Sequence, residues 1–146
     1  GVSDYYYPSA VGEKDGYFKL SNRSTGHWVE AYATWTGSKI PLWVTLSTYI
    51  FGADKNVDGK QMYSSYVEVG YTHSFNDNNS MAVCVGANLN KGFYTGCESG
   101  FNVVNINAKY STAFNFGNYK LPVSASYILN PYKNKSFFTM SLYFGI

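Results

Sequence analysis

Charged residues are scarce in this chain of 146 residues, which has 11 Lys and Arg, 9 Asp and Glu, and a net charge of +2. Their share of 14% is well below the roughly 25% of an average soluble domain, which argues against a disordered tail. The basic residues are scattered and form no stripe, so we expect no nucleic-acid partner.

Long apolar runs are also missing, because no stretch approaches the ~18 consecutive apolar residues that a membrane-spanning helix needs. A helical membrane protein is therefore excluded. The apolar pattern nowhere keeps a helical period, so helices longer than short turns are not expected. The length leaves room for a single domain, which we expect to span residues 1–146.

Aromatic residues are abundant, with 15 Tyr, 10 Phe and 3 Trp. Many fall in segments where apolar and polar side chains alternate, which is typical of a strand with two different faces. In one such segment, Val69 and Tyr71 share one face, whereas Glu68 and Gly70 share the other. The pattern predicts an all-β fold with eight strands, at 2–7, 27–36, 42–51, 62–75, 81–90, 102–116, 121–130 and 137–146.

The connections between these segments alternate in length. The long ones lie near 8–26, 52–61, 90–100 and 131–136, and the short ones near 37–41, 76–80 and 117–120. Long loops at one end of a sheet, short turns at the other, and aromatics at strand ends are typical of outer-membrane barrels. We therefore predict an antiparallel up-and-down transmembrane β-barrel in the bacterial outer membrane, with lipids as partners and no cofactor.

The polar face of the predicted strands would line the interior of such a barrel. We expect these polar residues to face the lumen: Glu30, Glu68, Lys109, Tyr66, Asn105 and Asn107. Their side chains either form an internal network that fills a narrow barrel, or line a pore and set its ion selectivity. Eight strands leave an interior that side chains can fill, which favours the filled barrel unless further strands widen it.

Several segments of the chain together carry a family resemblance. They are GVSDYYYP (1–8), HWVEAYATW (27–35), LSTYIFGADKNVDGKQMYSSYVEVGYTHSF (46–75), GFNVVNINAKYS (100–111), LPVSASYILNP (121–131) and FFTMSLYFGI (137–146). These segments resemble a family of Bacteroidota outer-membrane barrels, described as hypothetical or porin-like proteins. The resemblance covers most of the chain and implies a barrel rather than a chemistry. It also implies that further strands come first, so that this chain is the C-terminal part of a larger barrel.

Asp54, Asn56 and Asp58 have the alternating spacing of the first half of a calcium loop, with Gly59 at the sixth position. The second half does not fit, because position twelve is Ser65 rather than a bidentate Glu, and strands flank the loop. The pattern favours an exposed turn without a metal over a weak calcium site.

The two cysteines, Cys84 and Cys97, do not match any zinc-binding spacing. Cys84 is predicted on the inward face and Cys97 in a loop. Because both are equally far from Asn90-Lys91, a tight turn there would place them opposite each other as a disulfide. Otherwise they remain thiols.

Two histidines bear on catalysis, because barrel lipases and acyltransferases use a Ser, a His and a carboxylate. Neither His27 nor His73 has a carboxylate partner that the sequence predicts, so we do not expect an enzyme. A porin-like channel and a structural or accessory barrel, which binds other envelope proteins through its long loops, are the two leading functions. The alternatives are a soluble lipocalin-like ligand-binding barrel and an outer-membrane lipid-modifying enzyme.

Overall fold

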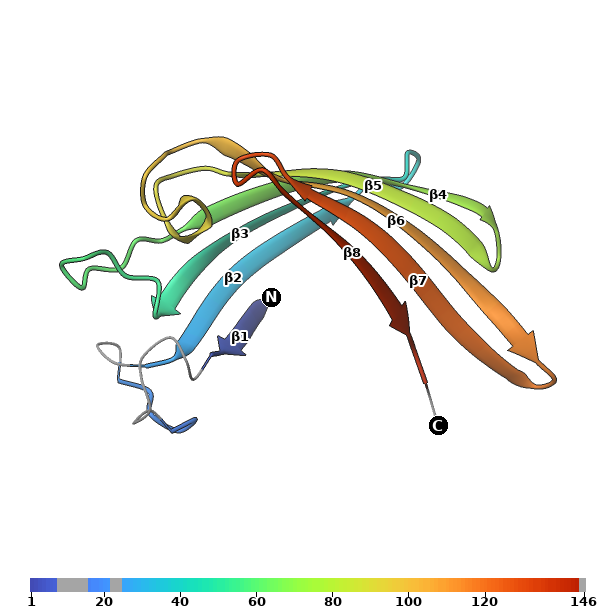
Figure 1. The fold of residues 1–146 in the computed structure, drawn as a ribbon, viewed down its shortest axis with the longest axis horizontal. Coiled ribbons are helices and arrows are strands. Elements are labelled where there is room, and N and C mark those ends of the chain that lie inside the picture. The colour runs from blue at the N-terminus through green and yellow to red at the C-terminus, as the bar shows by residue number, and fades with distance from the viewer. Residues whose placement is uncertain (8–15, 22–24, 145–146) are drawn as a thin grey trace. The chain divides into compact units, whose positions relative to one another are not determined.

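The chain folds into β-strands joined in one antiparallel sheet. The structure is a computed structural model that describes residues 1–7, 16–21 and 25–144. The strands are β1 (Val2–Tyr6), β2 (His27–Thr36), β3 (Leu42–Gly52), β4 (Ser65–Asn76), β5 (Asn79–Asn88), β6 (Asn102–Phe116), β7 (Tyr119–Asn130) and β8 (Lys135–Leu142). The sheet order follows the chain from β1 to β8 (Figure 1). This confirms the predicted eight-stranded, antiparallel, up-and-down arrangement.

Helix is confined to one short turn in the described part of the chain. This turn is η2 (Phe93–Thr95), a 3-10 segment in the connection between β5 and β6. None of the helices among the described residues has the length and hydropathy to cross a membrane.

The short turns explain why some strands begin earlier than the alternation predicts. In the turn from β4 to β5, the Asn76 side chain accepts hydrogen bonds from the backbone N–H groups of Asn78 and Asn79, at 2.9 Å each. Gly117 has a φ of 59°, the left-handed conformation that a two-residue hairpin needs, so β7 starts at Tyr119 rather than at residue 121.

The connection from β7 to β8 is shorter than predicted. It spans only residues 131–134, instead of 131–136. The Asn130 side chain accepts a hydrogen bond from the Lys133 N–H at 2.9 Å, and Asn134 adopts a φ of 48°, so the chain reverses within four residues. The prediction that this connection is one of the long loops was therefore wrong.

The chain divides into two compact units. Unit 1 comprises Gly1–Thr34, Thr45–Val67 and Ala87–Asn102, and unit 2 comprises Trp35–Val44, Glu68–Gly86 and Val103–Ile146. Strands β2 to β6 contribute residues to both. The long loops that the structure describes after β3 and β5 belong to unit 1, and the short turns belong to unit 2.

Burial in both units is inverted relative to an ordinary soluble domain. Apart from glycines, the buried residues of the described chain are mostly polar: Thr25, His27, Ser47, Asp54, Ser64, Asn88, Thr95 and Ser124, alongside Cys84, Ala87 and Val104. On β3, Ser47 is 6% exposed whereas its neighbour Leu46 is 51% exposed. The alternation of the sequence is therefore real, and its polar face is the better buried one.

A glycine lets one aromatic ring lie across the polar face of unit 2. Trp43 on β3 covers Gly70 on β4 so closely that a Cβ at Gly70 would lie 2.2 Å from the indole ring. No other residue leaves space for the indole in this position, because real Cβ atoms do not come that near to a ring atom.

Candidate functional site

The polar face of unit 1 holds a cavity of about 440 Å³. Strand alternation places its lining, since Glu30, Tyr32 and Thr34 alternate along β2, and Thr45, Ser47 and Tyr49 alternate along β3. The remaining lining residues are Ser3 and Tyr5 from β1, Tyr66 from β4, and Tyr94 from η2.

Five aromatic rings next to this cavity form a group that we call the loop-end aromatic cluster: Trp28, Tyr49, Tyr66, Phe93 and Tyr94. Tyr94 stacks on Tyr66 and Tyr49, with ring centroids 5.3 and 6.2 Å apart. Phe93 packs against Trp28 at 4.7 Å and against Tyr49 at 6.1 Å. The β5–β6 loop thus covers part of the polar face of unit 1 with its own aromatic side chains.

A buried carboxylate holds this loop in position. Asp54 is fully buried and accepts hydrogen bonds from the Ser64 N–H at 2.8 Å and from the Ser64 hydroxyl at 2.5 Å. The Ser64 oxygen in turn accepts the Phe93 N–H at 2.8 Å. Gly92 passes close to Ser64, since a Cβ there would lie 2.1 Å from the Ser64 hydroxyl. One polar chain therefore links the β3–β4 loop to η2.

Among the described residues that line the cavity, Glu30 alone carries a formal charge. Its carboxylate accepts a hydrogen bond from the Tyr5 hydroxyl at 3.3 Å. Burial, reinforced by the nearby Tyr49 phenol and by the charge of Glu30, raises the pKa of the Tyr94 phenol in the loop. Tyr94 is therefore neutral at physiological pH, and the charge of the cavity is negative.

The other predicted lumen residues lie on the polar face of unit 2. The Asn105 side chain donates a hydrogen bond to the Glu68 carboxylate at 2.7 Å, and the Cys84 thiol also bonds to Glu68. Lys109 lies opposite Ser126 in the pairing of β6 with β7. The amide oxygen of Asn107 is buried without a hydrogen-bond partner in the described chain. Glu68 and Asn105 are therefore brought together, whereas Glu30 and Tyr66 belong to unit 1.

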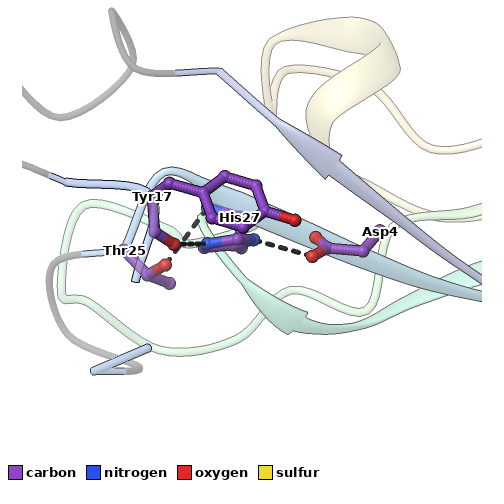
Figure 2. A network of polar contacts seen from close by, with 4 residues as sticks. All are labelled: Asp4, Tyr17, Thr25 and His27. Carbon is purple, nitrogen blue, oxygen red and sulfur yellow. Dashed lines mark hydrogen bonds and ion pairs between the residues drawn. The ribbon is translucent and has the colours of Figure 1, made fainter. Parts of the chain in front are cut away.

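The buried His27 side chain of unit 1 has a polar partner at each ring nitrogen (Figure 2). Its Nδ1 lies 2.7 Å from the Asp4 carboxylate, and its Nε2 lies 2.5 Å from the Tyr17 carbonyl oxygen. Thr25 accepts the His27 backbone N–H at 3.2 Å. Both ring nitrogens face acceptors, so the doubly protonated imidazolium satisfies the site best.

The environment of His27 changes its titration. The bond to the Tyr17 carbonyl, followed by the bond and charge of Asp4, outweighs burial and raises the pKa of His27 above its ordinary value. Because Nε2 is hydrogen-bonded to the Tyr17 carbonyl, this imidazole stabilises the β1–β2 connection and does not present a free nitrogen that could accept a proton from a nucleophile. The other histidine, His73, packs its ring against that of Phe75, with ring centroids 4.8 Å apart.

The three calcium-loop candidates are engaged differently. Asp54 binds Ser64, and the Asn56 side chain accepts the N–H groups of Asp58 and Lys60 at 3.0 and 2.9 Å. Asp58 is exposed. The described part of the chain holds no group of three or more His, Cys, Asp or Glu side chains placed to share a metal ion. The two bonds to Asn56 make this loop an Asx-stabilised turn.

Both cysteines are free thiols. Cys84 is buried beside Glu68 in unit 2, whereas Cys97 is exposed in unit 1, with its sulfur 3.2 Å from that of Met62. The tight turn at Asn90-Lys91 that pairing requires is replaced by the wider β5–β6 loop with η2. The disulfide is therefore not formed in this structure.

Sequence reasoning missed Asp4, Ser64 and Tyr94. One signal for the Asp54–Ser64 bond was available in the sequence: Ser64 is a short polar residue near the start of a predicted strand, and it follows a loop that contains a carboxylate.

The chain was compared with protein-family models, with curated proteins and with solved structures, and none of them matched.

Proposed function

We propose that this chain is an integral outer-membrane β-barrel protein of the bacterial envelope, whose polar face lines the lumen and whose apolar face contacts lipid. The observation that carries the proposal is the inverted burial. A soluble ligand-binding barrel keeps its apolar face inside, whereas an outer-membrane barrel turns it outward.

The apolar face is exposed on several strands of unit 2. Val69 on β4, Val85 on β5 and Met140 on β8 are 47%, 49% and 64% exposed, whereas Ser124 on β7 is 6% exposed. Soluble monomers rarely expose contiguous apolar surfaces of this kind, because water penalises them. Lipid chains remove that penalty, and the resemblance to Bacteroidota barrels supports the same environment.

Large aromatic rings also gather near the short turns of unit 2. Exposed aromatics end the strands at these positions: Trp35, Phe75, Phe114, Phe116 and Tyr119. The interface between lipid chains and headgroups favours such rings, which supports a membrane boundary at the turn end.

Of the two envelope roles, the loop-end aromatic cluster favours a structural or accessory barrel over an open channel. Rings that stack across the polar face, held by the Asp54–Ser64–Phe93 chain of hydrogen bonds, obstruct passage along that face in unit 1. The long loops would then serve as the surface for other envelope proteins.

Detergent dependence tests the membrane proposal. We expect the purified full chain to stay monodisperse in detergent and to aggregate when detergent is removed, because the apolar face is then exposed to water. A chain that stays monodisperse in buffer alone would instead support the soluble lipocalin-like barrel.

Planar-bilayer recording separates the two envelope roles. The accessory barrel predicts no stable conductance steps. Reproducible steps whose ion selectivity changes in Glu68→Gln would overturn the accessory role and establish a channel.

A further inference from the structure

The cavity on the polar face of unit 1 is lined by hydroxyl groups and a single carboxylate in the described part of the chain. Its lining combines five tyrosines, four Ser and Thr hydroxyls and one carboxylate, Glu30. Lys, Arg and His are absent from the described residues that line it. A volume of about 440 Å³ is in the range of small-molecule sites, roughly 300–1,000 Å³.

No described side chain that lines the cavity carries a positive charge to balance Glu30, and the N-terminal ammonium of Gly1 donates its hydrogen bond to the Tyr32 carbonyl oxygen at 2.8 Å. The hydrogen-bond donor to Glu30 is the neutral Tyr5 hydroxyl at 3.3 Å. In the same unit, His27 forms an ion pair with Asp4 of β1. A half-buried carboxylate with neutral surroundings has a stronger field than one in water, and this field attracts a mobile cation.

The tyrosines make the cavity suited to an organic cation in particular. Phenol rings attract cations toward their faces, and their hydroxyl oxygens accept hydrogen bonds from ammonium groups. Tyr94 stacks on Tyr66 at 5.3 Å, and this fixes one aromatic wall. Strongly hydrated metal ions prefer several carboxylate or carbonyl ligands, whereas the described lining offers a single carboxylate, that of Glu30.

We propose that this cavity binds a small organic cation of the alkylammonium class, with Glu30 as the counter-ion and the tyrosines as the enclosing wall. The site lies within unit 1 and does not require that lipid cover the apolar face. The inference therefore goes beyond the proposed membrane function, and each can fail without the other.

Calorimetric titration of the purified full chain with choline tests the proposal. The matched ligand is 3,3-dimethylbutan-1-ol, in which a carbon atom replaces the charged nitrogen. We expect saturable choline binding, with the neutral isostere weaker by about tenfold or more, because it lacks the Coulomb and cation–π attraction. Both titrations use the unmodified chain, so they decide the question whether or not a variant folds.

Two variants with the same change of charge locate the site. Glu30→Gln is expected to weaken choline binding by about tenfold or more. Glu68→Gln removes a carboxylate from the polar face of unit 2, outside the cavity, and is expected to leave the affinity unchanged. Far-UV circular dichroism establishes that each variant is folded.

The proposal is overturned if choline gives no saturable heat, if the neutral isostere binds equally well, or if a folded Glu30→Gln keeps the full affinity. Preferential binding of a neutral hexose would identify a polyol site instead. Detergent dependence is measured separately, so loss of the membrane proposal does not alter these outcomes.

Discussion

Replacing Asp54 by Ala is expected to destabilise the protein strongly, because this carboxylate is fully buried and holds both polar groups of Ser64. Hydrogen bonds to a charged acceptor contribute about 1.5–3 kcal/mol each, so losing two predicts a loss of about 3–6 kcal/mol. The change also leaves the Ser64 N–H and hydroxyl buried without their acceptor, and it releases the group that accepts the Phe93 N–H.

The matched control is Asp58→Ala, which removes an exposed carboxylate from the same loop. Surface changes of this kind stay within about 0.5 kcal/mol. Urea unfolding in detergent micelles, followed by tryptophan fluorescence, gives both free energies of unfolding. A double-mutant cycle of Asp54→Ala with Ser64→Ala should show a coupling of about 1–3 kcal/mol.

Calcium provides the contrasting explanation for the same residues. We expect the unfolding midpoint of the unmodified chain to be the same with and without millimolar calcium. A loss below about 0.5 kcal/mol for Asp54→Ala, or a calcium-dependent midpoint that Asp58→Ala abolishes, would refute the reasoning.

Three further outcomes follow from single contacts. Because the pKa of His27 is raised, the bonds of its imidazolium should stabilise the β1–β2 connection fully below the ordinary pKa of 6.5, and this stabilisation should be lost as pH rises through the raised value. Proteolysis near Tyr17 should therefore become faster at high pH in the unmodified chain, but not in His27→Ala. A rate of proteolysis that does not depend on pH in the unmodified chain would contradict this role of His27. Gly70→Val should lower the free energy of unfolding by about 3 kcal/mol, because the valine side chain displaces the indole ring of Trp43. Unchanged tryptophan fluorescence in this variant would argue against the packing of Trp43 on Gly70. A maleimide should label Cys97 in the folded protein and Cys84 only after unfolding, and equal labelling rates would show that the two thiols are equally accessible.

The strands could be predicted because alternation is a local property of the sequence. The bounds of 27–36 and 102–116 agree with β2 and β6. The strand predicted from residue 62 starts instead at Ser65, because Asp54 binds Ser64 and Tyr63 adopts a φ of 53°. Such a start depends on a partner ten residues away, which alternation does not reveal.

The site could be predicted only in part. The alternation placed Glu30 and Tyr66 on the polar face, where both line the cavity. Tyr94 was out of reach, since η2 is positioned by tertiary hydrogen bonds to the β3–β4 loop. The contact of Asp4 with His27 was not predicted, because it depends on the register between β1 and β2, in which Tyr6 pairs with His27. A long connection does not reveal that register.

The orientation of the sheet toward lipid is tested most directly by two neighbouring residues on β8, Thr139 and Met140, whose side chains alternate between the polar and apolar faces. An arginine at a lipid-facing position costs about 2–4 kcal/mol near the middle of a bilayer, whereas a lumen position tolerates it. We predict that Met140→Arg lowers the free energy of unfolding from lipid vesicles by this amount, and that Thr139→Arg changes it little. Equal effects of the two variants, or a larger loss for Thr139→Arg, would contradict the central claim that the apolar face contacts lipid.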